Sequence, residues 1–257
     1  MGAGISLAAL TGLFAVPAHA SDPAGGGYPE AAITHVFLLI GQSNMAGRGR
    51  VESVDRVAHP RVFALAEDRR WVPAVDPIAF DKPGLAGVGP GCTFGRAVAD
   101  SHPGWVVGLV PAAFGGTTLD QWRPDGKLYG DAVARTRVAL KGGARLAAIL
   151  WLQGESETPQ TAESYVARFG EMASRLREDL GARDVPILVG ELGRFVSVAD
   201  DVNPQLARLP SSVPRCGLVS SLGLTDKGDH LHFDSASARE LGRRYARAFG
   251  DGLRPGD

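Results

Sequence analysis

The chain is short of cysteine and of net charge, and each shortage excludes a class of protein. Its two cysteines, Cys92 and Cys216, belong to no CxxC pair or Cys/His cluster, so nothing supports a zinc site. The sequence leaves open whether they form a disulfide or remain separate buried thiols. A net charge of −1 gives no electrostatic footprint for nucleic acid or for an anionic membrane. We therefore expect no metal, no cofactor and no nucleic-acid or membrane partner.

The N-terminus lacks an apolar run long enough to cross a bilayer. Residues 5–16 are apolar but too few, and Pro17 interrupts them. Ala18-His19-Ala20 then fits a signal-peptidase site, although residues 1–4 contain no Lys or Arg. We expect a signal peptide at 1–20 cleaved after Ala20, a flexible mature N-terminus at 21–32, and one domain at 33–257. The protein would be secreted or periplasmic, and its oligomeric state stays open.

Apolar, β-branched segments are present at intervals along the chain. Each lacks clean alternation, as expected for strands covered on both faces. The predicted strands are residues 36–40, 105–113, 146–152, 185–190 and 216–222. Apolar residues from Tyr165 to Leu180 recur at helical spacing, and further helices are expected after Thr158 and near Ser235. This alternation predicts an α/β fold, a three-layer α/β/α sandwich around a five-stranded parallel sheet.

Residues 48–103 do not fit a plain crossover between two such strands. Residues 62–65 and 71–73 flank a charged turn, which suggests a small hairpin. Residues 83–95 are rich in glycine, and we expect them to form a loop near the edge of the sheet.

Ser43 directly follows the first predicted strand, where open α/β sheets place their ligands. A serine needs a base to become a nucleophile, and backbone N–H groups to hold the oxyanion. A strand-to-helix turn supplies such an N–H at the serine itself. Taken alone, Ser43 is more often a simple helix cap.

The base and its carboxylate partner are expected near the C-terminus. Asp229 and His232 are separated so that one loop can carry both, and Asp229 can fix the tautomer of His232. His230 is the fallback base, and both histidines could instead lie at the surface. Two further donors are expected at the same edge: the Gly116 N–H after the second strand and the Gln153 amide after the third. The plain readings of these two are a tight turn and a solvent-facing glutamine.

Four short blocks occur in order: Gly-Gln-Ser-Asn-Met-Ala-Gly at 41–47, Ala-Phe-Gly-Gly-Thr at 113–117, Gln-Gly-Glu-Ser at 153–156 and Asp-x-x-His-Phe-Asp at 229–234. Together they resemble the blocks of the SGNH hydrolases, in the branch of sialate O-acetylesterases and acetyl xylan esterases, over about residues 34–249. The resemblance implies a flavodoxin-like sheet, Ser43 as nucleophile, His232 as base and Asp229 as its partner. It also implies an oxyanion hole of the Ser43 and Gly116 N–H groups with Gln153. Glu157 stands where the branch often has aspartate.

The sequence thus predicts a serine esterase that removes O-acetyl groups from a carbohydrate, either acetyl xylan or O-acetyl sialic acid, through an acetyl-serine intermediate. Selectivity would come from contacts with the sugar, because the acetyl group is small. Candidate sugar contacts are Asp120, Gln121 and Trp122, although Trp122 could equally be core. Candidate cations for a sialate carboxylate are Arg48, Arg123 and Arg194.

Two other enzyme classes lack their motifs. An α/β-hydrolase elbow requires G-x-S-x-G, but Met45 stands two residues after Ser43. No P-loop motif occurs either. Two alternatives on the same fold remain: an esterase for hydrophobic or general short acyl chains, and a non-catalytic carbohydrate-binding protein.

Overall fold

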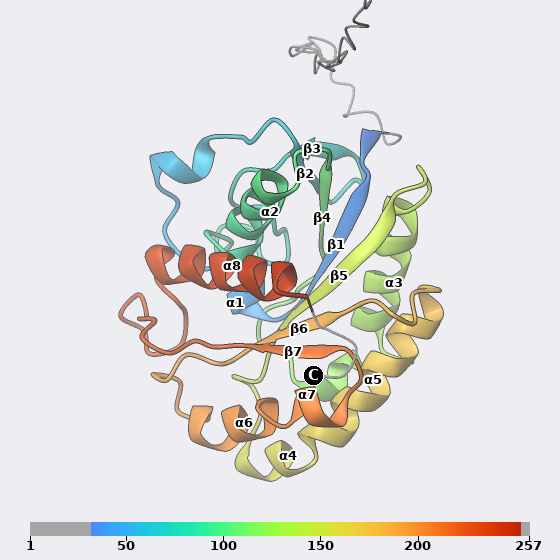
Figure 1. Ribbon diagram of the computed structural model, residues 1–257. Helices are drawn as coiled ribbons and strands as arrows, with labels where there is room; N and C mark the ends of the chain where they lie inside the picture. Colours follow the sequence, from blue (N-terminus) through green and yellow to red (C-terminus); the bar gives the residue numbers. More distant parts are fainter. Residues whose placement is uncertain (1–31, 253–257) are drawn as a thin grey trace, which may run out of the picture.

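A mostly parallel sheet forms the centre of the protein in the computed structural model, which describes residues 32–252 (Figure 1). The strand order is β3-β2-β4-β1-β5-β6-β7, and within the described residues β3 is the antiparallel member. The strands are β1 (His35–Gly41), β2 (Val62–Leu65), β3 (Trp71–Pro73), β4 (Val107–Pro111), β5 (Arg145–Leu152), β6 (Ile187–Gly190) and β7 (Cys216–Val219). The predicted signal peptide, 1–20, lies outside the described residues, as does 21–31 of the predicted flexible segment.

Helices cover both faces of this sheet and complete three layers (Figure 1). The helices are α1 (Ser43–Ala46), α2 (Pro90–Ser101), α3 (Lys127–Ala139), α4 (Pro159–Glu163), α5 (Tyr165–Asp179), α6 (Ala199–Leu206), α7 (Leu209–Ser212) and α8 (Ser235–Gly250), with 3-10 turns η2 (Ser53–Arg56) and η3 (Leu119–Trp122). Side chains of β1 alternate between the two layers: Leu38 packs in the cluster with α3, α5 and α6, and Phe37 in the cluster with α2 and α8. The predicted α/β/α sandwich is confirmed.

The order of the parallel strands places the site. Without the β2–β3 hairpin, the strands follow the order second, first, third, fourth, fifth in the chain, which is the flavodoxin-like doubly wound arrangement. Such a sheet opens a crevice beyond the strand ends where the winding reverses, here between β1 and β5. Ser43 follows β1 and Gln153 follows β5, so both lie at this crevice.

The sheet has seven strands, so the prediction of five was wrong in number. The predicted hairpin exists, but it joins the main sheet, with β2 parallel to β4 through the register Val62↔Val107. All four residues of β2 are buried, which explains why the hairpin does not stand apart. The five strands predicted as parallel are parallel, each within a few residues of its expected bounds.

The expected loop at residues 83–95 was also wrong in its second half, because α2 begins at Pro90. Glycine is unfavourable in a helix, yet here it permits close packing. A Cβ on Gly95 would lie 2.8 Å from Val62 Cγ1, and one on Gly242 of α8 would lie 2.4 Å from the Pro90 oxygen. The close approach of α2 to the sheet and to α8 therefore outweighs the weak helical propensity of this segment.

Cys92 and Cys216 are both free and buried, and they belong to the clusters on opposite faces of the sheet. The question left open by the sequence is thus answered in favour of separate thiols. A search of residues 32–252 for a helix of sufficient length and apolarity to span a membrane finds none.

Candidate active site

A glycine at the end of β1 brings Ser43 into place. Gly41 has φ +130°, and a Cβ there would lie 2.0 Å from the Leu152 oxygen of β5, so only glycine fits this close approach. The next residue, Gln42, donates its N–H to the same Leu152 oxygen at 2.9 Å. The chain then turns into α1, whose first residue is Ser43, itself only 5% exposed. The serine is fixed at the crevice by backbone contacts with the neighbouring strand.

The loop before α8 brings a histidine and a carboxylate to this serine. His232 Nε2 lies 3.0 Å from Ser43 Oγ, and His232 Nδ1 lies 2.7 Å from Asp229 Oδ2. The other Asp229 oxygen, Oδ1, accepts the backbone N–H groups of His232 at 2.8 Å and Leu231 at 3.1 Å. The three residues therefore form one continuous hydrogen-bonded line in the order expected for nucleophile, base and orienting group.

The charge of Asp229 is secured by these contacts. Partial burial works against ionisation, but the hydrogen bonds from the His232 backbone, the His232 ring and Leu231 hold the pKa of Asp229 well below its usual range. A carboxylate that stays ionised keeps a proton on His232 Nδ1 and leaves Nε2 to accept the serine proton. His230 lies apart from Ser43: its side chain is 84% exposed and is directed to Asp226.

Two consecutive glycines line the other side of Ser43. A Cβ on Gly115 would lie 3.2 Å from Ser43 Cβ, so the backbone passes directly over the serine. The Gly115 N–H donates to Asp81 Oδ2 at 2.9 Å, and Gly116 adopts φ +80°. Within the described chain, the N–H groups of Ser43 and Gly116 donate to no protein acceptor. These two groups are available to an oxyanion beside Ser43.

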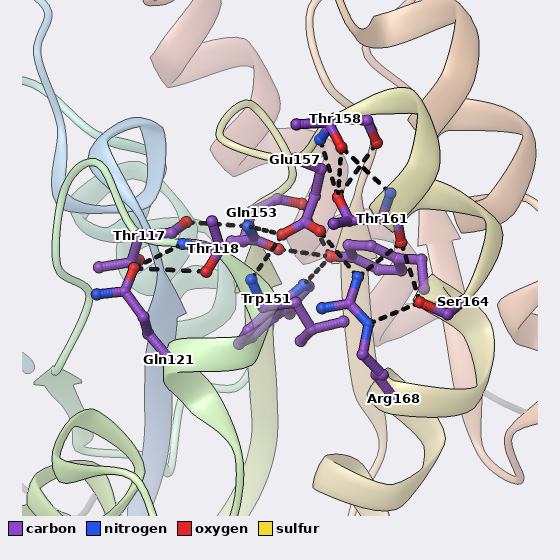
Figure 2. A network of polar contacts seen from close by, with 12 residues as sticks. Thr117, Thr118, Gln121, Trp151, Gln153, Glu157, Thr158, Thr161, Ser164 and Arg168 are labelled. Carbon is purple, nitrogen blue, oxygen red and sulfur yellow. Dashed lines mark hydrogen bonds and ion pairs between the residues drawn. The ribbon is translucent and has the colours of Figure 1, made fainter.

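Gln153 lies at the same edge of the sheet but is fully buried rather than solvent-facing. Its Nε2 donates to the Thr117 carbonyl at 2.9 Å and to Glu157 Oε1 at 3.1 Å (Figure 2). Its Oε1 accepts the Tyr165 hydroxyl at 2.9 Å. A primary amide has two N–H bonds, and both are occupied here. This differs from the expectation of a free third oxyanion donor: direct donation would require the amide to leave one of these acceptors.

Glu157 gives this network its charge. Burial opposes ionisation, but hydrogen bonds from Arg168, the Leu119 N–H, Thr161 and Gln153 lower the pKa of Glu157. Arg168 Nη2 lies 2.8 Å from Glu157 Oε2 (Figure 2). Glu157, whose role the sequence did not define, thus supports Gln153, which in turn holds the carbonyl of the residue after Gly116.

Each of the three predicted sugar contacts has protein partners of its own. Trp122 is 1% exposed and packs edge-on against Trp151, so it has no face for a sugar ring and belongs to the core. Gln121 accepts the Thr118 N–H in a local cap, and the exposed Asp120 pairs with Arg123. An exposed aromatic side chain does occur nearby in the sequence: Phe114 is 40% exposed and directly precedes Gly115, whose backbone approaches Ser43.

The three candidate arginines all have carboxylate partners. Arg48 is buried against Asp81 at 2.6 Å, Arg123 pairs with Asp120 and Asp125, and Arg194 pairs with Glu191. A cation that sequence reasoning missed is Lys82, whose Nζ would lie 3.6 Å from a Cβ on Gly116. In the described part of the chain, Lys82 has no ion pair. Its only signal in the sequence was its position directly before the glycine-rich segment.

A search of residues 32–252 for three or more His, Cys, Asp or Glu side chains placed to hold a metal ion finds no such group. The fold and the hydrogen-bonded serine, histidine and aspartate define a hydrolase of the SGNH type.

The family described as carbohydrate esterase, sialic acid-specific acetylesterase, matches residues 33–251. A probable carbohydrate esterase of Arabidopsis thaliana is 34% identical over 234 residues, covering 83% of this chain and 89% of the plant protein. The X-ray structure of an Arabidopsis thaliana protein superposes with a TM-score of 0.80 at 31% identity, covering 86% of this chain and all of that one. The chain belongs to this carbohydrate esterase family.

More distant structures share the fold. A carbohydrate acetylesterase from Xanthomonas citri has a TM-score of 0.62 at 19% identity, over 83% of this chain and 55% of that one. An aryl esterase from M. smegmatis has a TM-score of 0.51 at 15% identity, over 86% of this chain and all of that one.

Proposed function

We propose that the protein removes O-acetyl groups from a carbohydrate through an acetyl-serine intermediate. Carbohydrate deacetylation follows from the family; the covalent step is carried by one observation, the line from Ser43 Oγ through the His232 ring to Asp229. In this reaction Ser43 Oγ attacks the acetyl carbonyl while His232 Nε2 takes the serine proton. The Ser43 and Gly116 N–H groups hold the carbonyl oxygen as it becomes negative.

The tetrahedral intermediate then collapses to acetyl-serine, which water hydrolyses. His232 returns the proton to the sugar oxygen, which leaves as a hydroxyl, and the acetyl group stays on Ser43. A water molecule gives a proton to His232, attacks the acetyl carbonyl, and releases acetate while Ser43 regains its proton. Asp229 remains ionised throughout and stabilises the imidazolium that forms in each half.

The direct test is to trap the intermediate. Wild-type protein quenched in acid during turnover of p-nitrophenyl acetate should carry one acetyl group, and peptide mapping should place it on Ser43. Ser43→Ala should fold normally and lose nearly all turnover, because removal of a triad nucleophile leaves only the catalysis due to binding and the oxyanion hole. Near wild-type hydrolysis by folded Ser43→Ala would remove the serine from the mechanism.

For the sugar, we propose a substrate with a negative charge near the ester, as in O-acetyl sialic acid, rather than neutral acetyl xylan. Lys82 supports this choice, because it is a cation without an ion pair in the described chain and it lies beside Gly116. The exposed ring of Phe114 offers an apolar face to the sugar at the same place, with Lys82 Nζ 6.0 Å from its centre.

Lys82→Met tests the charge. It should lower kcat/KM for acetylated sialic acid by about two- to fivefold, the scale of one exposed ionic contact, and leave acetylated xylan and p-nitrophenyl acetate unchanged. Lys127→Met is the matched control, since it removes an equal charge from an exposed ion pair with Asp131. Equal losses on charged and neutral substrates would contradict the role of Lys82.

Export through residues 1–20, based on the Ala-His-Ala site, also remains a proposal, which N-terminal sequencing of the mature protein would test.

A further inference from the structure

Asn44, the residue after Ser43, is hydrogen-bonded to the backbone on both sides of His232. We call residues 229–234, which carry Asp229 and His232, the histidine loop. Asn44 Nδ2 donates to the Leu231 carbonyl at 3.0 Å, and Asn44 Oδ1 accepts the Phe233 N–H at 3.0 Å. Leu231 and Phe233 are the two neighbours of His232. The amide of Asn44 is 3% exposed, so no water competes readily for these bonds.

A buried carboxyl group fixes the orientation of this amide. Glu155 Oε1 accepts the second N–H of Asn44 at 2.5 Å, and Glu155 Oε2 is buried without a partner. Burial raises the pKa of Glu155, although the hydrogen bond from Asn44 and those from the backbone oppose this. Rotating the amide by half a turn would set its oxygen against the oxygens of both Glu155 and Leu231, so only one orientation is satisfied.

We infer that Asn44 and Glu155 are positioning residues for the base: Asn44 holds the backbone around His232 at a fixed distance from Ser43, and Glu155 holds Asn44. This inference rests on the proposed function, since it requires Ser43 and His232 to be the reacting pair.

The position of Asn44 in the chain explains why its hydrogen bonds can fix the base. Ser43 and Asn44 are consecutive in α1, so the helix that carries the nucleophile also carries the side chain that holds the backbone around His232. The loop itself is tied at its other end by Asp229, which accepts the N–H groups of Leu231 and His232. Without Asn44, the loop would be free to shift relative to α1, and a displacement of about 1 Å at reacting groups can cost on the order of a hundredfold in rate.

Asn44→Asp is the most informative variant, because it keeps the shape and the acceptor for Phe233 but replaces the donor by an oxygen that faces Leu231 and Glu155. We expect kcat for p-nitrophenyl acetate to fall by about ten- to a hundredfold, with KM within about threefold. The rate at which a fluorophosphonate probe modifies Ser43 should fall in parallel, since this reaction needs the serine and its base but no sugar recognition.

Glu155 provides the rescue test. Glu155→Gln keeps the shape of the side chain and an acceptor for Asn44, so probe reactivity should stay within about twofold of wild type. Glu155→Leu removes that acceptor, so most of the positioning effect on probe reactivity should be lost. This pair also decides the matter if Asn44→Asp does not fold. Wild-type probe reactivity in folded Glu155→Leu, or an equal loss in Glu155→Gln, would overturn the inference.

Asn203 is a matched control. It grips Leu192 in the same manner, accepting its N–H at 2.8 Å and donating to its carbonyl at 3.1 Å, and it too is buried. Asn203→Asp should lower thermal stability to a similar extent while the folded protein keeps wild-type probe reactivity. Wild-type reactivity in folded Asn44→Asp, or an equal loss in Asn203→Asp, would show that the effect is only structural. If the wild-type protein itself fails to react at Ser43, it is the proposed function that is wrong.

Discussion

Replacing Gln153 by leucine separates two roles that the sequence could not distinguish. Both amide hydrogens of Gln153 are bound, one of them by the carbonyl of Thr117. We therefore expect Gln153 to shape the oxyanion site through the 115–117 backbone rather than to touch the oxyanion. Leucine has nearly the same volume but no polar atom, so the substitution removes the hydrogen bonds with little change in packing.

The expected loss of stability follows from the partners left behind. The buried Thr117 carbonyl loses its hydrogen bond from Gln153 and has no other partner among residues 32–252, at a cost of about 1–3 kcal/mol for an unsatisfied group. Glu157 Oε1 keeps the Leu119 N–H at 2.6 Å, and the Tyr165 hydroxyl keeps the backbone oxygen of residue 153 at 3.0 Å. With the lost bond to the charged Glu157 added, we expect the free energy of unfolding to fall by about 2–4 kcal/mol.

The effect on rate should be smaller than for a direct donor. Removal of one oxyanion donor lowers kcat by about 10²–10³. An indirect role through Thr117 should lower kcat by no more than about tenfold, with KM little changed. Urea unfolding gives the stability, and turnover of p-nitrophenyl acetate at a temperature where every variant is folded gives the rate.

Tyr165→Phe is the control, because it removes a hydroxyl from the same network without touching Thr117. It should cost stability and leave kcat near wild type. A loss of more than a hundredfold in kcat for Gln153→Leu, with the free energy of unfolding within about 1 kcal/mol of wild type, would refute this reasoning and restore Gln153 as a direct donor.

Three further predictions concern the base, metal dependence and the buried Asp76. His232→Ala should approach the defect of Ser43→Ala in p-nitrophenyl acetate turnover while His230→Ala keeps most activity, and the reverse result would mean that the base is misassigned. Activity should survive dialysis against EDTA, and a loss restored by one added metal would contradict a metal-free mechanism. Burial, reinforced by Asp55, raises the pKa of Asp76 to about 7. Between about pH 4 and pH 7, the folded protein therefore keeps a proton on Asp76 that the unfolded chain has released. As pH rises through this range, Asp76 lowers the free energy of unfolding by up to about 1.4 kcal/mol per pH unit. Asp76→Asn should gain stability relative to wild type as pH rises from 5 to 7.5 in urea unfolding, and a difference independent of pH would contradict the assignment.

Patterns of single elements were readable from the sequence because they depend on local chemistry. The stripe that includes Tyr165, Phe169 and Met172 predicted α5, all three being buried. Thr158 caps α4 as expected, accepting the Thr161 N–H. The motif around Ser43 and the spacing of Asp229 and His232 likewise indicated which groups would meet.

What the sequence could not show depends on the partners that a residue finds far along the chain. Trp122 and Gln153 have the same side-chain chemistry whether they face a substrate or the core, and only packing against β5 and α5 decides. Asn44 lies in the block at 41–47 and Glu155 in the block at 153–156, yet their hydrogen bond joins residues 111 positions apart. Position within a block was the only signal for them.

Ser43 and His232 are in contact in the fold but lie 189 positions apart in the chain, near opposite ends of the described sequence. During synthesis, the segment that carries Asp229 and His232 emerges after every strand of the sheet. Hydrolysis of a chromogenic ester is therefore a readout of complete assembly, since a chain that stops before this segment has a serine but no base. The same separation makes the protein a natural reporter for fragment complementation: a fragment that ends after β7 and a peptide that spans the histidine loop and α8 should each be inert, and turnover would measure their reunion.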